Sequence, residues 1–376
     1  MAADLGSMAG GASSLQSDSA SSSCCSGVAA FVDGLMNGVR LLCWNVGGLS
    51  YDKFCSLCSF LVKFDIICLT ETWLEIGAES RFEIHNFVRI RVVGASRRMG
   101  RGRRSGGILL FVSNQIEPYI SILKVPQLQD NMIWLNLVPR DDVMIILAFL
   151  YFAPMNSPYG MPDVFEKLHM ALESVMKGVD PQFDGEPTVI IMGDFNARTG
   201  RLSDTNSIQQ GGTFQPGSLD NAIEDSPLPP RYSLDSETNH YGKCLLELCK
   251  AMGLVIANGR VRGENDGFSF ISNMGRSTID YALLNSEALH LVEEMNMHTR
   301  VESDHLPLSV SPLYSVNAGN KFSFTRYDQE AEEVTYPLKR YRWHWNGEKV
   351  FYRKYLSYTI LCGDLLILSV TGRIIW

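Results

Sequence analysis

Acidic and amide side chains follow several apolar runs of this sequence, at positions that would let them share one site. Asn45, Glu71 and Asp194 each come at or just after the end of such a run, and Asn196 lies two residues beyond Asp194. A short apolar run bounded by turn formers is typical of a buried strand that ends at the rim of a sheet. Asp and Asn after a strand are also ordinary turn residues. The recurrence of the pattern favours a common site.

Four more polar residues extend this set. Tyr151 follows another apolar run, and Asp280 lies inside one. A buried ionised aspartate is destabilising unless a partner compensates it. We expect that partner in the segment 302–308, which contains Asp304 and His305.

The chemistry of these groups favours a hard cation and a phosphate substrate. Several oxygen ligands with a single histidine suit Mg²⁺, with Mn²⁺ as an alternative, rather than zinc. Such an ion neutralises a phosphodiester, while an Asp with an Asn orients the attacking water and an Asp–His pair fixes the imidazole. Cys55 and Cys58 form a C-x-x-C without a second pair at zinc-ligand spacing, so we expect no zinc site there.

The composition is that of a globular protein, with 45% hydrophobic residues among 376 and a formal net charge of −8. This charge argues against a protein coated in basic surface, so any contact with nucleic acid must come from a local cluster. Cysteines inside apolar runs suit a reducing compartment. No run of about twenty apolar residues and no secretory signal is found, which predicts a soluble intracellular protein without a membrane partner.

Alternation of apolar runs with helical periodicity predicts an α/β domain over residues 37–312. We expect a disordered Ser/Ala/Gly-rich tail over residues 1–36, and a connector with a C-terminal extension over residues 313–376. The polar connection 198–239 is either functional or disordered. The expected strands are 40–45, 65–69, 107–112, 132–137, 143–149, 189–192, 254–258, 268–271 and 278–284, and the expected helices are 51–64, 162–176 and 241–252.

The densest basic cluster lies between residues 89 and 104. An arginine-rich loop of this kind matches phosphate oxygens and predicts a nucleic-acid contact. It could instead be a solvated hairpin tip, or a nuclear localisation patch, a use compatible with the phosphate role. The residues selected for nucleic-acid binding are Arg97, Arg98, Arg101, Arg103 and Arg104.

Five motifs in this order resemble the endonuclease/exonuclease/phosphatase superfamily over roughly residues 38–312. They are Leu42-Cys43-Trp44-Asn45-Val46, Leu69-Thr70-Glu71-Thr72-Trp73, Gly193-Asp194-Phe195-Asn196, Ile279-Asp280-Tyr281 and Ser303-Asp304-His305. Within the superfamily, the segments 70–74, 151–154, 194–198 and 254–260 look most like the apurinic-type endonuclease domain of non-LTR (LINE-like) retrotransposons. Repair endonucleases of the superfamily usually carry Gln where this chain has Thr70.

The resemblance implies a four-layer sandwich in which two central mixed β-sheets are flanked by helices. It also implies a Mg²⁺ site with Glu71 as the principal ligand. Asn45 would lie nearby, and Asp304 would complete the metal pocket.

The same resemblance implies the catalytic roles. Asp194 would act as the base and Asn196 would place water or phosphate, with Tyr151 as a phosphate contact. Asp280 would orient His305, which would bond to the scissile phosphate.

These expectations together predict a Mg²⁺-dependent endonuclease that nicks one DNA strand and leaves a 3′ hydroxyl, as in target-primed reverse transcription. The alternatives are a phosphatase or phospholipase of the same superfamily, and a non-catalytic, element-derived DNA-binding relic. The chain ends too soon to hold a reverse transcriptase domain, so we expect a product truncated before it, with the segment 339–345 as a remnant of the connector. A nuclear location is favoured over a cytoplasmic one.

Overall fold

The computed structural model describes residues 39–97, 104–140, 143–183, 185–205, 228, 230–265 and 267–312. The expected tail, the expected C-terminal connector and extension, and Arg98, Arg101 and Arg103 lie outside these residues. Most of the connection 198–239 lies outside them as well, namely 206–227 and 229. No helix in the described part of the chain is both long and apolar enough to cross a membrane.

Six strands form the first sheet, in the order β13-β14-β1-β2-β4-β3. β1 and β2 are parallel, and the other neighbours are antiparallel, so this sheet is mixed. The strands are β1 (Leu41–Asn45), β2 (Ile66–Thr70), β3 (Phe87–Ser96), β4 (Ser105–Ser113), β13 (Val292–Met297) and β14 (Leu308–Pro312).

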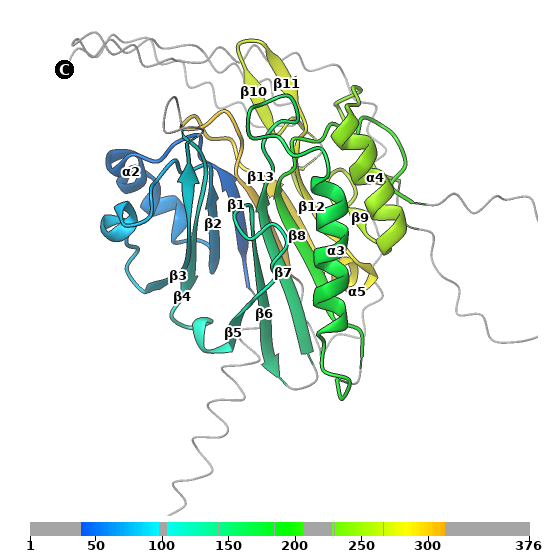
Figure 1. Ribbon diagram of the computed structural model, residues 1–376, viewed down its shortest axis with the longest axis horizontal. Coiled ribbons are helices and arrows are strands. Elements are labelled where there is room, and N and C mark those ends of the chain that lie inside the picture. Colours follow the sequence, from blue (N-terminus) through cyan, green and yellow to red (C-terminus); the bar gives the residue numbers. More distant parts are fainter. Residues whose placement is uncertain are drawn as a thin grey trace, which may run out of the picture.

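The second sheet is also mixed and has six strands, in the order β5-β6-β7-β8-β12-β9. Here β7 and β8 are the parallel pair. The strands are β5 (Ile120–Leu123), β6 (Met132–Arg140), β7 (Val143–Tyr151), β8 (Thr188–Asp194), β9 (Val255–Ile256) and β12 (Asp280–Leu284). A separate hairpin, β10 (Phe270–Ser272) and β11 (Gly275–Ser277), projects from one end of the molecule (Figure 1).

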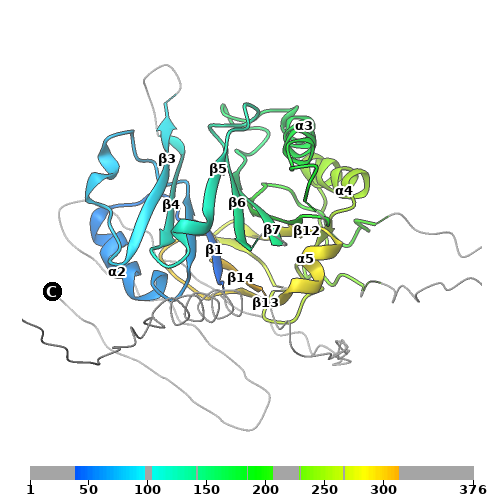
Figure 2. The same cartoon turned by 90° about the horizontal axis from the view of Figure 1, so that it is seen from below.

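Helices cover the outer faces of both sheets. Figure 2 shows α2 (Tyr51–Leu61) against the first sheet, and α3 (Val164–Lys177) with α4 (His240–Met252) against the second. One apolar core lies between the sheets, and one lies under the helices on each side. The short α5 (Ser286–Leu291) adds to the core between the sheets. This is the predicted four-layer sandwich, which is confirmed.

The strand β14 is an interior strand of the first sheet, between β13 and β1, although no strand was expected there from the sequence. It pairs antiparallel with β1, with Cys43 opposite Leu308. Its sequence alternates: Leu308 and Val310 are buried in the core between the sheets, and a serine follows each of them. The half-exposed edge strands β3 and β5 and the strand β13 were also missed. These four strands alternate or are partly polar, whereas the predicted strands are mostly continuous apolar runs.

Candidate active site

Three of the predicted site residues lie side by side across one sheet. In the register of the second sheet, Asp194 is paired with Tyr151 on one side and with Asp280 on the other. Paired residues of neighbouring strands project to the same face. The end of β8, with its neighbours in β7 and β12, therefore carries two carboxylates and a phenol as one group.

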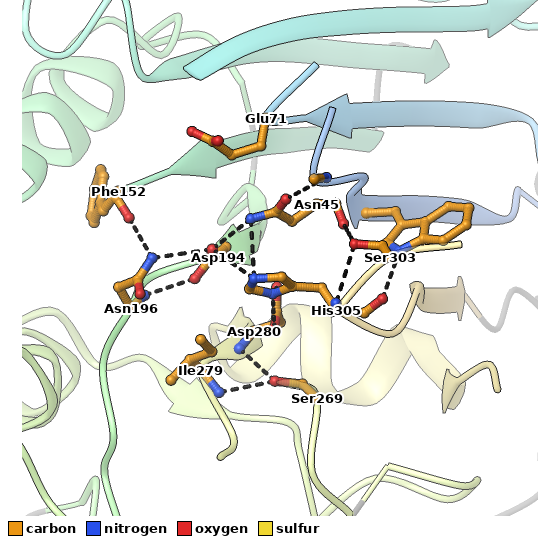
Figure 3. A network of polar contacts seen from close by, with 12 residues as sticks. Asn45, Glu71, Phe152, Asp194, Asn196, Ser269, Ile279, Asp280, Ser303 and His305 are labelled. Atoms are coloured by element: carbon orange, nitrogen blue, oxygen red, sulfur yellow. Dashed lines mark hydrogen bonds and ion pairs between the residues drawn. The ribbon is translucent and has the colours of Figure 1, made fainter. Parts of the chain in front are cut away.

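The first sheet supplies Asn45 and Glu71 at the facing rim. Asn45 is the last residue of β1 and is paired with Thr70, the last residue of β2, so that Glu71 follows immediately. The Asn45 Nδ2 atom donates to Asp194 Oδ2 over 2.9 Å, and its Oδ1 accepts from the Gly47 N–H. Residues from both sheets thus meet in one polar network (Figure 3).

His305 and Asp280 form a buried pair. His305 Nδ1 lies 2.9 Å and 3.1 Å from the two carboxylate oxygens of Asp280, which places the Nδ1 proton between them. Burial lowers the pKa of His305, but the Asp280 and Asp194 carboxylates outweigh it and raise that pKa to about 9. The ring is therefore an imidazolium at neutral pH, with Nε2 facing Asn45 and Asp194 at 3.3 and 3.7 Å.

Asp194 is the most deeply buried acid of the network, with 1% of its surface exposed. Its carboxylate accepts hydrogen bonds from Asn45, from the backbone N–H of Asn196 at 2.9 Å and from Asn196 Nδ2 at 3.1 Å. Burial raises the pKa of Asp194 to about 7; Asp280 adds to this effect, while His305, Asn45 and Asn196 oppose it. A carboxylate of this pKa can take a proton from water near neutral pH.

Glu71 is buried beside this network and makes no ion pair with a basic side chain in the described residues. Its Oε1 accepts from Ser105 Oγ at 3.1 Å and from the Gly106 N–H at 2.5 Å, and its Oε2 accepts from the Trp73 indole. A buried carboxylate without a positive partner is costly unless a cation binds it.

Two neighbours of Glu71 bear on whether a cation fits. The fully buried Thr70 hydroxyl has no hydrogen-bond partner within the described part of the chain. Burial, and then the charges of Glu71 and Asp194, raise the pKa of Tyr151 far above its usual value, so its hydroxyl stays protonated. The oxygen-rich surroundings of Glu71 therefore fit a hard divalent cation.

The structure brings most of the predicted site residues together, although it describes only some of the predicted nucleic-acid contacts. Asp304 lies next to His305 with an exposed side chain, and its backbone oxygen accepts from the Ile271 N–H. Arg97 is exposed, whereas Arg104 pairs with Glu75. The residues that converge are Asn45, Glu71, Tyr151, Asp194, Asn196, Asp280 and His305.

Several supporting residues were missed in the sequence. The Ser269 hydroxyl accepts from the backbone N–H groups of Ile279 and Asp280, at 2.9 and 3.0 Å. Ser303 Oγ donates to the Asn45 carbonyl at 2.6 Å and accepts from the His305 N–H. Single serines carry no local signal that distinguishes these roles. Ser303 lies within a quoted motif, and its position before Asp304 and His305 was the only available hint.

One group of side chains has the spacing of a possible metal site. Ligand atoms of Asp194, Asp280 and His305 all lie within 4.8 Å of one another, and all three residues are buried. The contacts of His305 with Asp280 have hydrogen-bond lengths, however, and a proton occupies that space. These three groups are therefore better suited to proton transfer than to metal binding.

Several solved structures are similar to this chain. The chain aligns with an AP endonuclease from Leishmania major at 16% identity and a TM-score of 0.54, over 74% of this chain and 89% of that one. The endonuclease domain of TRAS1, a telomere-specific non-LTR retrotransposon, aligns at 18% identity and a TM-score of 0.44, over 73% and 98%. A 3′-5′ exonuclease from Neisseria meningitidis aligns at 15% identity and a TM-score of 0.45, over 73% of this chain and 100% of that one.

A search of curated proteins gave no match. The family model of the Endonuclease/Exonuclease/phosphatase family matches residues 42–305, which is most of the chain and contains the whole polar network. This chain belongs to the endonuclease/exonuclease/phosphatase family.

Proposed function

We propose that the protein is a divalent-metal-dependent endonuclease that hydrolyses a DNA phosphodiester and nicks one strand. Members of its family are metal-dependent hydrolases. The observation that carries the proposal is the contact of Asn45, from one sheet, with Asp194 and His305, from elsewhere in the fold. This contact joins a base, an imidazolium and an amide within reach of one reacting phosphate.

Asp194 acts as the general base in this proposal. Its pKa of about 7 leaves a large fraction ionised at neutral pH, so the carboxylate can accept the proton of an attacking water. Asn196 holds that carboxylate in place through its backbone N–H and side chain. The Asn196 side chain also donates to the Phe152 carbonyl at 2.7 Å, which limits its rotation.

His305 stabilises the phosphate in its transition state. The imidazolium carries an Nε2–H that can donate to a phosphate oxygen, while Asp280 keeps the charge on the ring and fixes its direction through Nδ1. The neutral Tyr151 hydroxyl offers a second donor to the phosphate.

Glu71 would hold the divalent cation, with an oxygen atom of the nearby Asn45, and Mg²⁺ is the ion that these donors suit best. Asp304, whose side chain is exposed beside His305, stays a predicted further ligand. When bound, the cation supplies charge neutralisation at the phosphate and at the leaving oxygen. Mn²⁺ has similar ligand preferences and is the natural substitute in experiments.

DNA is the proposed substrate because of the basic cluster and the retrotransposon-like motifs. Arg97 and Arg104 of the cluster are described, and Arg97 is exposed. Together with Arg98, Arg101 and Arg103 they would neutralise phosphates on either side of the cleaved bond. The likeness of the motifs to LINE-like endonuclease domains supports nicking that leaves a 3′ hydroxyl for priming. A nuclear location follows from this proposal.

The test is nicking of supercoiled plasmid in Mg²⁺ or EDTA by the wild type, Asp194→Ala and His305→Ala. We expect open circles with the wild type and with the control variant, in Mg²⁺ only, and none with Asp194→Ala or His305→Ala. Asp163→Ala serves as the control, because Asp163 is exposed at the start of α3 and pairs only with Lys167 in the described residues. Equal nicking by all four proteins would refute the assignment of the site. Hydrolysis of a small phosphodiester without plasmid nicking would favour the phosphatase or phospholipase alternative.

A further inference from the structure

Glu71 and Trp73 have a backbone conformation that residues other than glycine rarely adopt. Glu71 has a φ of 52° and Trp73 a φ of 59°, both in the left-handed region. Such residues persist only where their surroundings hold them, and they cluster at functional sites. Four backbone hydrogen bonds hold the segment 71–73: Thr72 N–H to Gly107 O, Trp73 N–H to Gly106 O, Gly48 N–H to Glu71 O and Leu49 N–H to Thr72 O.

The turn brings the Trp73 indole back onto the Glu71 carboxylate. The indole Nε1–H donates to Glu71 Oε2, while the other oxygen, Oε1, accepts from Ser105 and Gly106. Each carboxylate oxygen therefore has its own donor on its own side. Because a carboxylate offers only about four lone-pair positions, these donors decide which of them can face a cation.

The indole also lies against the loop that follows Asn45. A Cβ atom on Gly48 would come within 2.2 Å of Trp73 Cε3 and 2.3 Å of Cζ3, so only glycine leaves room for the ring. The same Gly48 donates its N–H to the Glu71 carbonyl over 2.7 Å. Trp73 thus contacts the carboxylate of Glu71 and lies against Gly48 at the same time.

We propose that Trp73 is a positioning residue of the metal site, which holds the Glu71 carboxylate in the orientation that binds the divalent cation. The inference rests on the metal role of Glu71 in the proposed function. Partners that hydrogen-bond to a metal ligand commonly change metal affinity or activity by about 10- to 100-fold when they are removed. A purely structural role would instead depend on the bulk of the ring and not on its N–H group.

Trp73→Phe separates these two roles, because phenylalanine keeps a ring and lacks the N–H donor. We expect the dissociation constant for Mn²⁺, measured by calorimetry without DNA, to rise about 10- to 100-fold in Trp73→Phe. Trp134→Phe is the matched control, since Trp134 is buried in β6 and its indole nitrogen has no hydrogen-bond partner among the described residues. Wild-type affinity in Trp73→Phe would overturn the inference.

A pair of glycine variants tests the same contact without altering Trp73, and decides the question if Trp73→Phe does not fold. Gly48 and Gly77 both have a φ of 95°, but a Cβ on Gly77 meets nothing within 4 Å. We expect Gly48→Ala to displace the indole and weaken Mn²⁺ binding, and Gly77→Ala, which carries the same backbone strain, to bind as the wild type does. Equal affinities of the two variants would contradict the inference.

Nicking assays separate this inference from the proposed function. In Trp73→Phe we expect the Mg²⁺ concentration for half-maximal nicking to rise by the same factor, with kcat largely restored at saturating Mg²⁺. If the wild type binds Mn²⁺ more tightly than Trp73→Phe but nicks no DNA, the proposed function is wrong and the role of Trp73 stands. If the wild type nicks DNA and Trp73→Phe binds metal as tightly as the wild type does, the proposed function stands and the role of Trp73 is wrong. A wild type that binds no metal overturns the inference.

Discussion

Asn45, at the end of β1, donates a 2.9 Å hydrogen bond to Asp194, at the end of β8 in the other sheet. The same amide nitrogen lies 3.3 Å from His305 Nε2. One short side chain therefore connects the two sheets and contacts both the proposed base, Asp194, and the proposed phosphate donor, His305. The geometry of the site therefore depends on the distance between the two sheets.

Asn45→Ala removes a hydrogen bond that favours the ionised form of Asp194, so the pKa of Asp194 rises above about 7. Activity needs the carboxylate and is lost as the pH falls through this pKa. We therefore expect the acidic limb of the kcat/KM profile for nicking to move to higher pH, with a loss of about 10- to 100-fold at its plateau. Asn136→Ala is the control, because Asn136 is a half-buried residue of β6, and an unmoved limb in Asn45→Ala would contradict the prediction.

Asp280→Asn removes the charge that holds the pKa of His305 at about 9. Since nicking needs the imidazolium, activity is lost as the pH rises through this pKa, and the variant should lose it at a lower pH than the wild type. At neutral pH we expect kcat to fall about 100-fold or more. A pH profile of single-turnover nicking measures both effects. The idea fails if the basic limb of Asp280→Asn coincides with that of the wild type.

Glu71→Gln tests the metal site by stability. A ligand that binds only the folded protein raises its melting temperature, so Mg²⁺ should stabilise the wild type against thermal unfolding. We expect this rise to be absent in Glu71→Gln and retained in Glu75→Gln, whose carboxylate is exposed and pairs with Arg104. Differential scanning calorimetry with Mg²⁺ and with EDTA measures the effect. An equal rise in both variants would place the cation elsewhere.

Replacing Arg101, Arg103 and Arg104 by glutamine tests the basic cluster. Each phosphate contact that is lost should reduce the slope of log K against log salt concentration by about 0.9. Arg40→Gln is the control, because Arg40 precedes β1 at the end opposite Asn45 and pairs with Asp65. Binding of a labelled duplex across salt concentrations gives the slope. An unchanged slope in the triple variant would favour the alternative interpretation, in which the cluster is a solvated hairpin tip.

His298 makes the fold sensitive to acid. Burial, with Lys63 and Arg300, lowers the pKa of His298 below its ordinary value of 6.5. The unfolded chain therefore takes up a proton before the folded one does, so the free energy of unfolding decreases as the pH falls below 6.5. The ring packs edge-on against Phe60 and Phe64, and Nε2 contacts Ser309 Oγ at 2.7 Å.

His298→Phe keeps an aromatic ring and removes the titrating group. We expect its free energy of unfolding, measured in urea, to fall less between pH 7 and pH 5 than that of the wild type. His169→Phe is the control, since the His169 side chain is 40% exposed on α3. A wild-type pH dependence in His298→Phe would show that other groups cause the loss of stability.

Local pattern was sufficient for much of the fold. Continuous apolar runs predicted the central strands β1, β2, β7, β8 and β12, and helical spacing predicted α2, α3 and α4. These segments are buried on one or both faces, so the pattern of apolar residues alone indicates their burial. The five spaced motifs supported the sandwich and the family. Strands whose residues alternate or are half-exposed, such as β3 and β14, lack a comparable signal.

The sequence by itself determined which reactive groups stand at strand ends and in which order. The family resemblance already implied that Asp280 orients His305, and these two residues are in contact. Only the tertiary structure decided that Asn45 reaches Asp194, across 149 positions of the chain. Such contacts depend on strand register and on the packing of two sheets against one core. These are set by the sum of many distant side-chain contacts, which no local pattern contains.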